Sequence, residues 1–152
     1  MNLKDAVQIR DTHVGKGVFA AQDFPFSAVI GEIEGTIIVD RNYASSYCFD
    51  LEDDCQLEPD PPFRYVNHSC DPNCEFDWFF EADSDDVVTT KRLYLITLRE
   101  ISNGEELTID YNWPAEGAIR CECNSPLCRG WIVSVDEIDQ VEKNKKPDFR
   151  IT

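Results

Sequence analysis

Three cysteines near the C-terminal end of the chain have a spacing that is typical of a metal site. Cys121, Cys123 and Cys128 follow the pattern C-x-C-x4-C. Structural zinc sites are tetrahedral and use four cysteine or histidine ligands, so this segment lacks one ligand. Cys70 and Cys74 are the candidates, and spacing alone does not choose between them. Ordinary buried cysteines would not gather as three within eight residues, so we predict a zinc site that joins two distant stretches.

Two polar residues, Asn67 and His68, lie just before the candidate ligands Cys70 and Cys74. Asn67 and His68 stand before a Ser-Cys-Asp-Pro turn, within the run from Arg64 to Cys74. Both side chains form hydrogen bonds where the chain reverses, and buried polar groups most often only satisfy the backbone around them. Taken alone, this pair is therefore interpreted as structural.

Two further motifs are weak when read separately. Gly15-Lys16-Gly17 permits close approach of the backbone to a ligand, but a turn is the default interpretation. Tyr111 ends an extended segment, and its hydroxyl, with a pKa of about 10, is neutral at pH 7 and serves as a hydrogen-bonding group. The chain has no H-E-x-x-H motif and no phosphate-binding loop, so hydrolase and nucleotide-kinase functions have no support.

The elements that must position these residues are mostly strands. Short apolar or alternating runs predict strands at 7–11, 18–21, 28–33, 36–39, 93–98 and 106–111. One helix is expected from Ser134, where Ser134 and Glu137 form a capping-box pattern, and a tail is expected after Lys143. Three prolines mark the acidic middle segment as a loop: Pro59, Pro61 and Pro62. We predict a mainly β domain.

Composition restricts the partners. The 152 residues carry a formal net charge of −16, which disfavours binding to duplex nucleic acid and favours a basic partner. Acidic residues concentrate at 50–60 and 75–86, and on charge alone these runs are interpreted as solvated loops. No signal sequence or membrane-spanning run is found, so an intracellular location is expected. The odd count of seven cysteines agrees with a reducing compartment, with Cys48 and Cys55 as free thiols.

Taken in order, the motifs resemble the SET-domain protein-lysine methyltransferases. The similar segments are Gly15–Ala20, Tyr47–Leu51, Arg64–Cys74, Leu95–Tyr111 and the post-SET zinc motif Cys121–Trp131. The resemblance implies a mainly β SET-domain fold of several small curved sheets. A C-terminal pseudoknot would bring the N-H-S-C and D-Y motifs together. It also implies a SET domain at 1–116, a post-SET zinc segment at 117–133 and a C-terminal helix and tail at 134–152.

The resemblance also implies roles for individual residues. S-adenosylmethionine would be the methyl donor, Tyr111 the catalytic residue, and the ε-amine of a lysine the acceptor. The residues expected to contact the donor are Lys16, Gly17, Tyr47, Arg64, Asn67 and His68. A structural Zn²⁺ would be bound by Cys70, Cys121, Cys123 and Cys128, which selects Cys70 over Cys74.

The lysine channel departs from the family pattern at two positions. Ile33 stands where the family often has tyrosine, and Ile109 stands where it has phenylalanine or tyrosine, while Trp131 would form a channel wall. An apolar Ile109 leaves more room beside the amine, so we expect di- or trimethylation.

The expected partner is a lysine-containing basic protein segment, with histone tails favoured, and the chain is expected to be a monomer that binds no membrane. Its location would be cytoplasmic in a bacterium and nuclear in a eukaryote or a virus. The alternative function is a catalytically weak SET domain that acts as a zinc-stabilised peptide-binding module.

Overall fold

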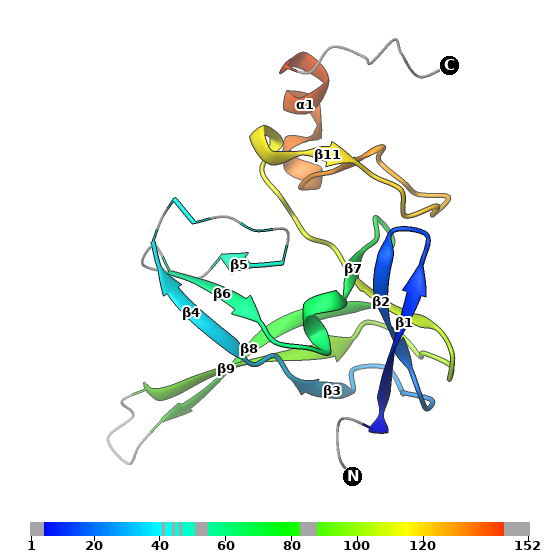
Figure 1. Ribbon diagram of the computed structural model, residues 1–152, viewed down its shortest axis with the longest axis vertical. Coiled ribbons are helices and arrows are strands. Elements are labelled where there is room, and N and C mark those ends of the chain that lie inside the picture. Colours follow the sequence, from blue (N-terminus) through cyan, green and yellow to red (C-terminus); the bar gives the residue numbers. More distant parts are fainter. Residues whose placement is uncertain are drawn as a thin grey trace.

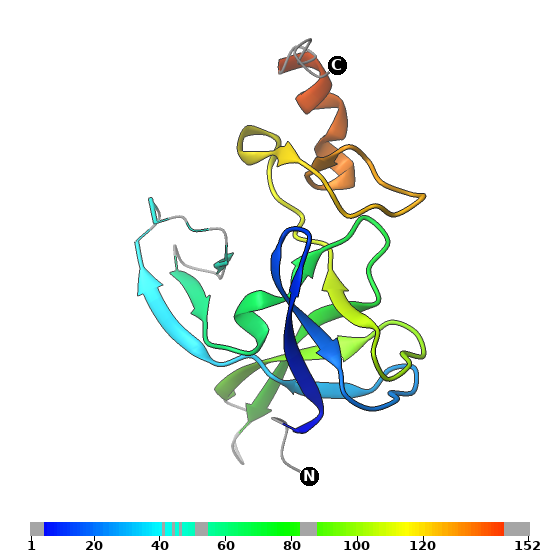
Figure 2. The same cartoon turned by 45° about the vertical axis from the view of Figure 1, so that its right-hand side comes forward.

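The computed structural model describes residues 5–40, 42–43, 45, 47–50, 55–82 and 88–144. Within these residues the strands form four small sheets, and α1 (Ile138–Asn144) is the only α-helix. The three larger sheets lie together, and the segment from about residue 113 onward lies to one side of them (Figures 1 and 2). No helix in the described part of the chain has the length and apolar character needed to cross a membrane.

The four-stranded sheet joins the two ends of the predicted SET domain. Its strands are β1 (Val7–Thr12), β2 (Gly15–Ala20), β10 (Glu106–Ile109) and β7 (Asn67–His68), in that order. β1 and β2 pair in antiparallel fashion around the turn at 13–14, as the predicted strands at 7–11 and 18–21 allow. The turn interpretation of Gly15-Lys16-Gly17 is wrong, because these residues begin β2 and pair with β1. β10 pairs with β2 on one side and runs parallel to β7 on the other. This insertion of a late strand between two earlier ones brings the N-H-S-C and D-Y motifs together, as predicted.

A second sheet contains β3 (Val29–Glu32), β9 (Val88–Thr97) and β8 (Cys74–Ala82). The interpretation of the acidic run at 75–86 as a loop is wrong for its first part, which is strand β8. Glu75 and Asp77 are exposed, whereas Phe76 and Trp78 between them pack against the main core. This two-residue alternation gives the acidic side chains one face of the strand and the aromatic rings the other. Residues 83–87 lie outside the described part.

The third sheet consists of β4 (Gly35–Val39), β6 (Cys55–Pro59) and β5 (Phe49–Asp50). The loop predicted around Pro59 is wrong here, because Cys55–Pro59 pairs with β4 and Pro59 is the last residue of the strand. A proline is tolerated at such an end, where its missing N–H disrupts no ladder. Gly35 faces the backbone of Glu58 so closely that a Cβ atom would overlap it. A 3-10 turn, η2 (Phe63–Tyr65), then leads to β7.

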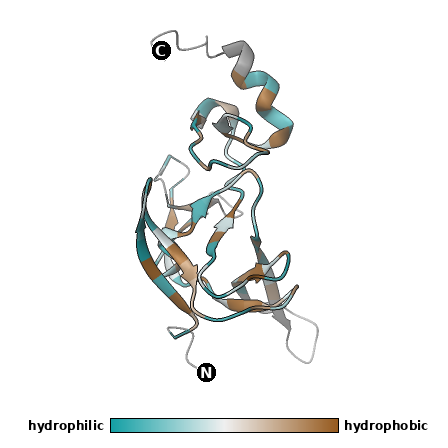
Figure 3. Cartoon of the chain, turned by 90° about the vertical axis from the view of Figure 1, so that its right-hand side faces the viewer, coloured by the Kyte–Doolittle hydropathy of each residue, from teal (hydrophilic) through white to brown (hydrophobic). Residues whose placement is uncertain are grey.

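The C-terminal segment has its own small core. It contains η3 (Ala115–Gly117), the paired strands β11 (Ile119–Arg120) and β12 (Trp131–Ile132), η4 (Val135–Glu137) and α1. Ala115, Ala118, Val133 and Val141 are buried together, and Trp131 and Ile138 pack against them. Hydrophobic and hydrophilic residues alternate along α1 accordingly (Figure 3). This core draws residues from all three predicted divisions of the chain, whose boundaries stay a prediction.

The helix predicted from Ser134 is present, but its cap differs from the predicted capping box. The Ser134 hydroxyl accepts a hydrogen bond from the backbone N–H of Asp136 at 3.4 Å. Glu137 does not return to the Ser134 N–H, which donates to the Trp113 carbonyl at 2.8 Å instead. The Glu137 carboxylate accepts from the N–H of Ala115 at 3.4 Å. Hydrogen bonds to Trp113 and Ala115 therefore take the place of the second, reciprocal bond of the predicted capping box.

Candidate active site

A cavity of about 640 Å³ lies between the β1–β2 hairpin tip, residues 64–69, strand β10 and the cysteine-rich segment. Its wall carries charges of both signs, from Lys16, Arg64, Glu106, Arg120 and Glu122. The stretches that meet here are far apart in sequence, so the cavity exists only because β10 is inserted beside β2 and β7.

The Asn67 side chain has a defined orientation in this cavity. Its Nδ2 donates to the Lys16 carbonyl at 3.0 Å and to Glu106 Oε2 at 2.9 Å. Both N–H bonds of the amide are thereby used, and Oδ1 is left as an acceptor. Gly17 makes the arrangement possible, because a Cβ atom there would lie 2.8 Å from the Glu106 carboxylate and 3.2 Å from Asn67 Nδ2.

His68 connects the catalytic candidate to the cysteines. Its Nδ1 accepts a hydrogen bond from the backbone N–H of Tyr111 at 3.1 Å, so the ring proton is on Nε2, which lies 3.4 Å from Cys70 Sγ. Burial lowers the pKa of His68 to about 4, although the nearby Asp110 carboxylate opposes this effect. The ring is therefore neutral at physiological pH and donates to sulfur.

Tyr111 lies just beyond the end of β10 and is largely buried. Its hydroxyl donates to the Val66 carbonyl at 2.6 Å. Its ring centroid is 5.4 Å from the His68 ring and 5.4 Å from the Trp113 ring. Burial raises the pKa of Tyr111 above its usual value, so the phenol stays protonated. Because its proton is given to Val66, the oxygen offers only lone pairs to a neighbouring group.

Tyr111 and Trp113 also border a second cavity, of about 560 Å³. The remaining lining comes from Tyr43, Ser45 and Cys48 before β5, from one residue each of β5, β6 and β8, and from residues 112, 114 and 117. None of the described residues that line this cavity is a lysine, arginine, aspartate or glutamate. A charged cavity and an uncharged one thus meet at the same phenol and indole.

Arg64 and Tyr47 form one side of the first cavity. The guanidinium carbon of Arg64 lies 4.1 Å from the centroid of the Tyr47 ring. Its Nη1 also donates to Glu58 Oε1 at 3.0 Å, which fixes the side chain along β6. A cation stacked on an aromatic face in this way holds both groups in place.

The four cysteines predicted as ligands form one cluster. The sulfur atoms of Cys70, Cys121, Cys123 and Cys128 all lie within 4.8 Å of one another. Cys70 and Cys121 are 3.8 Å apart, which matches the roughly 3.8 Å between ligands placed tetrahedrally about 2.3 Å from Zn²⁺. Cys74 instead pairs with Thr97 inside the second sheet and is 1% exposed. The donor set and its geometry therefore fit a tetrahedral metal ion.

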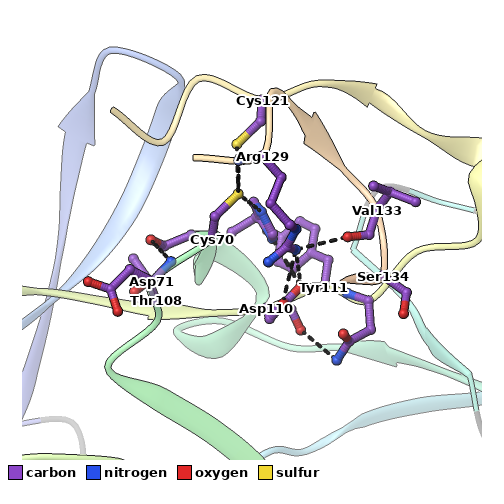
Figure 4. A network of polar contacts seen from close by, with 12 residues as sticks. Cys70, Asp71, Thr108, Asp110, Tyr111, Cys121, Arg129, Val133 and Ser134 are labelled. Carbon is purple, nitrogen blue, oxygen red and sulfur yellow. Dashed lines mark hydrogen bonds and ion pairs between the residues drawn. The ribbon is translucent and has the colours of Figure 1, made fainter. Parts of the chain in front are cut away.

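Burial raises the pKa of Cys70 and Cys121, and hydrogen bonds oppose this effect at two of the four thiols. Although burial alone would raise it, hydrogen bonds from the backbone at Cys70 and Ser125 lower the pKa of Cys123 to about 7. The backbone N–H of Arg129 donates to Cys70 Sγ at 3.3 Å (Figure 4). Thiolates are the ligands that soft and borderline metals select.

The three predicted channel residues belong to the two hydrophobic cores or pack on them. Ile33 is 4% exposed and Ile109 is 2% exposed, and both belong to the main core. Trp131 packs on the C-terminal core, and the guanidinium carbon of Arg120 lies 4.7 Å from its ring centroid. None of the three is among the described residues that line either cavity. Their channel role stays a prediction.

Several residues at the site were missed by the sequence analysis. Glu106 orients Asn67, Trp113 lines both cavities beside Tyr111, and Arg129 binds Asp110. His13 Nε2 lies 2.6 Å from the Glu122 carbonyl, and therefore donates to it across the mouth of the first cavity. Glu106 and Arg129 had a signal in the sequence, because they lie within the segments 95–111 and 121–131 that resemble the family.

Comparison with known proteins identifies the class. A family model described as the SET domain matches residues 15–112, and the chain therefore belongs to the SET-domain family. It is 30% identical over 145 residues to the histone-lysine N-methyltransferase trithorax of Drosophila virilis, a match that covers 85% of this chain and 4% of that protein. It is 32% identical over 132 residues to the H3 lysine-4 specific histone-lysine N-methyltransferase of Schizosaccharomyces pombe, covering 76% of this chain and 14% of that one.

Solved structures show the same fold. KRYPTONITE in complex with mCHG DNA and SAH superimposes with a TM-score of 0.70 at 22% identity, over 87% of this chain and 30% of that chain. The complex of KRYPTONITE with mCHH DNA, an H3(1-15) peptide and SAH gives a TM-score of 0.70 at 21% identity. The chain thus corresponds to a small part of the longer proteins that it resembles.

Proposed function

We propose that this chain transfers a methyl group from S-adenosylmethionine to the ε-amine of a lysine in a basic protein segment. The observation that carries the proposal is the position of Tyr111 where a charged cavity and an uncharged cavity meet. A direct transfer between two substrates needs two compartments joined at the reacting atoms. Family membership and the methyltransferase names of the relatives support the same function.

The first cavity suits S-adenosylmethionine, which supplies an electrophilic methyl group on a sulfonium and also carries an ammonium and a carboxylate. Asn67 Oδ1 and the Glu106 carboxylate can accept hydrogen bonds from a cationic amine. Lys16 and Arg64 provide positive charge for a carboxylate. The SAH found in the KRYPTONITE complexes supports this assignment.

The second cavity suits the neutral form of a lysine side chain. A free lysine has a pKa of about 10.4, so only roughly 0.1% of the amine is neutral near pH 7.4. A cavity without ionised side chains disfavours the ammonium and so promotes loss of its proton. The Tyr111 oxygen, which has already donated its proton to Val66, can accept a hydrogen bond from the amine and direct its lone pair toward the first cavity.

We further propose that the thiol cluster binds Zn²⁺ and that this ion is structural. Four cysteine ligands leave no open coordination position for a substrate, which is the pattern of structural sites. Binding would order residues 121–130, which border the first cavity through Cys121, Glu122 and Cys123.

The substrate is proposed to be a histone tail or a similarly basic segment, in view of the net charge of −16 and the histone-lysine names of the relatives. A di- or trimethyl product is also proposed, on the sequence pattern at position 109 alone, since Ile109 is buried in the main core and lines neither cavity. Mass spectrometry of a methylated peptide tests this point. A strictly monomethyl product would contradict this point. The intracellular location stays part of the proposal.

The second candidate is a peptide-binding module with little activity. The departures at Ile33 and Ile109 favour it. Calorimetry with S-adenosylmethionine separates the two functions, because a module has no need of the first cavity and would bind no donor.

The deciding experiment compares Tyr111→Phe with wild type, using labelled S-adenosylmethionine and a panel of histones. We expect transfer to fall by about 10²-fold or more, as for loss of a positioned proton-transfer or hydrogen-bonding group, with donor binding retained. Tyr94→Phe on β9, which lies at neither cavity, is the matched control. Equal transfer by wild type and Tyr111→Phe would exclude the assigned role.

A further inference from the structure

Arg129 touches both the thiol cluster and the residue that precedes Tyr111. Its backbone N–H donates to Cys70 Sγ at 3.3 Å. Its Nη2 donates to Asp110 Oδ1 and Oδ2, each at 3.0 Å, and to the Val133 carbonyl at 2.8 Å. Figure 4 shows the side chain extending from the cysteine pair to Asp110. A single residue therefore spans the metal site, the end of β12 and the D-Y motif.

The ion pair is held away from solvent. The side chains of Arg129 and Asp110 are 16% and 22% exposed, so their interaction is weakly screened. His68 Nδ1 lies 3.7 Å from Asp110, but this nitrogen already accepts the Tyr111 N–H and so makes no hydrogen bond to the carboxylate. Arg129 thus supplies the positive charge that balances Asp110.

Stability alone does not account for this arrangement. The Nε of Arg129 is buried and has no hydrogen-bond partner in the described part of the chain. Buried donors without partners are rare and unfavourable, and they indicate that another requirement fixes the group. We attribute the position of the guanidinium to the contact between its Nη2 and Asp110, the residue that precedes Tyr111.

The segment that carries Arg129 has no regular secondary structure of its own and contains three of the four clustered thiols. Residues 121–130 are all described and contain no helix or strand. Their internal backbone bonds include Cys121 N–H to the Gly130 carbonyl at 3.1 Å and Cys128 N–H to the Ser125 carbonyl at 3.0 Å. Metal binding orders such segments, because few other contacts do so.

We propose that Arg129 is a positioning residue that couples occupancy of the thiol site to the placement of Tyr111. With the four cysteines held by an ion, the backbone at 129 is fixed and the guanidinium holds Asp110, and through it the backbone of residues 110–113. When the cysteines are free, this restraint on Tyr111 is lost. The inference builds on the proposed function but concerns a connection that exists in the fold without substrate.

The test measures amide hydrogen exchange of residues 110–113 in zinc-loaded wild type, Arg129→Met and Arg129→Lys. Arg99→Met is the matched control, since Arg99 pairs with Glu105 on the surface away from the cavities. We expect exchange in Arg129→Met to be at least about fivefold faster than in wild type, Arg129→Lys to be intermediate because it keeps one cationic donor, and Arg99→Met to be unchanged. Zinc affinity, measured by competition with a chromogenic chelator, should fall by less than tenfold.

Asp110→Asn provides a second route if Arg129→Met fails to fold or to bind zinc. It keeps the shape of the side chain and leaves the cysteine segment intact, and it should accelerate exchange of the same amides, with no further increase in the double variant.

In activity assays, Arg129→Met should lower kcat about tenfold and change KM for either substrate by less than threefold. Wild-type protection of residues 110–113 in both zinc-loaded variants would overturn the proposal. A wild-type chain that transfers no methyl group would instead refute the proposed function, and the exchange result would still decide the coupling.

Discussion

The orientation of the Asn67 carboxamide follows from its neighbours before any ligand binds. Two fixed acceptors, the Lys16 carbonyl and Glu106, take both of its N–H bonds. Its oxygen is therefore the atom presented to the first cavity. Preorganised polar groups of this kind bind a ligand without first having to reorient.

Gly17→Ala tests this local arrangement. A methyl group at 17 would meet the Glu106 carboxylate and Thr12 at 2.8 Å, so the Glu106 and Asn67 side chains must move apart. We expect affinity for S-adenosylmethionine to fall about tenfold and stability to fall by about 1–3 kcal/mol, as for other overpacked sites. Calorimetry and urea unfolding measure the two effects. Gly117→Ala is the control, since nothing lies within 4 Å of its added Cβ, and equal behaviour of the two variants would contradict the interpretation.

Cysteine reactivity distinguishes the cluster from the core. Cys74 is 1% exposed, whereas the four cluster cysteines are only partly buried. Burial also raises the pKa of Cys74 to about 12, so at pH 8 only about one thiol in 10⁴ is ionised. We expect iodoacetamide to spare Cys74 in native protein both with and without a chelator, and to label Cys70, Cys121, Cys123 and Cys128 only after metal removal. Peptide mass spectrometry identifies each site. Early labelling of Cys74 on chelation would mean that it belongs to the metal site.

At the scale of elements, strand prediction succeeds where pattern and turn chemistry agree. The β1–β2 hairpin and β10 follow from alternation and turn residues, whereas β8 was missed because its acidic residues were read as a charge run rather than as one face of a strand. The parallel pairing of Thr108 with Asn67 has no local signature at all. Only the resemblance to a family predicted this pairing, which brings the segment around Asn67 next to the segment that ends in Tyr111.

The same limit applies to contacts between side chains. The cysteine spacing was sufficient to predict a metal site, but the choice of Cys70 needed the family pattern. The pairing of Arg129 with Asp110 joins positions whose residue types are common in any sequence, so only the fold reveals it.

The β1–β2 hairpin tip meets the cysteine-rich segment through His13 and the Glu122 carbonyl, at 2.6 Å. Both elements border the first cavity, so this hydrogen bond closes one side of it. In His13→Ala we expect SAH to dissociate about five- to tenfold faster, corresponding to the roughly 1 kcal/mol of one hydrogen bond. Stopped-flow displacement measures the rate. Gln8→Ala on the same hairpin is the control, and identical rates in all three proteins would show that the contact does not retain the ligand.

At the scale of the whole molecule, the charge of −16 predicts how a basic substrate is found. Exposed charges attract over about 10 Å at 0.1 M salt and over less at higher concentration. We expect KM for a lysine- and arginine-rich peptide to rise several-fold between 50 and 300 mM NaCl, while KM for S-adenosylmethionine changes little. Steady-state kinetics at a series of salt concentrations provides the measurement. A peptide with the same target lysine and neutral flanks is the control, and a salt response shared equally by both peptides would argue against long-range attraction.

The insertion of β10 between β2 and β7 has a consequence for the order of events during synthesis. Contacts of such large sequence separation raise the contact order of the domain and slow its folding. The ribosome must release residue 109 before the central strand of that sheet can enter, and residue 128 before the last sulfur is available. The facing edges of β2 and β7 therefore stay unpaired until β10 has been released, and the walls of the first ligand compartment cannot come together before that step.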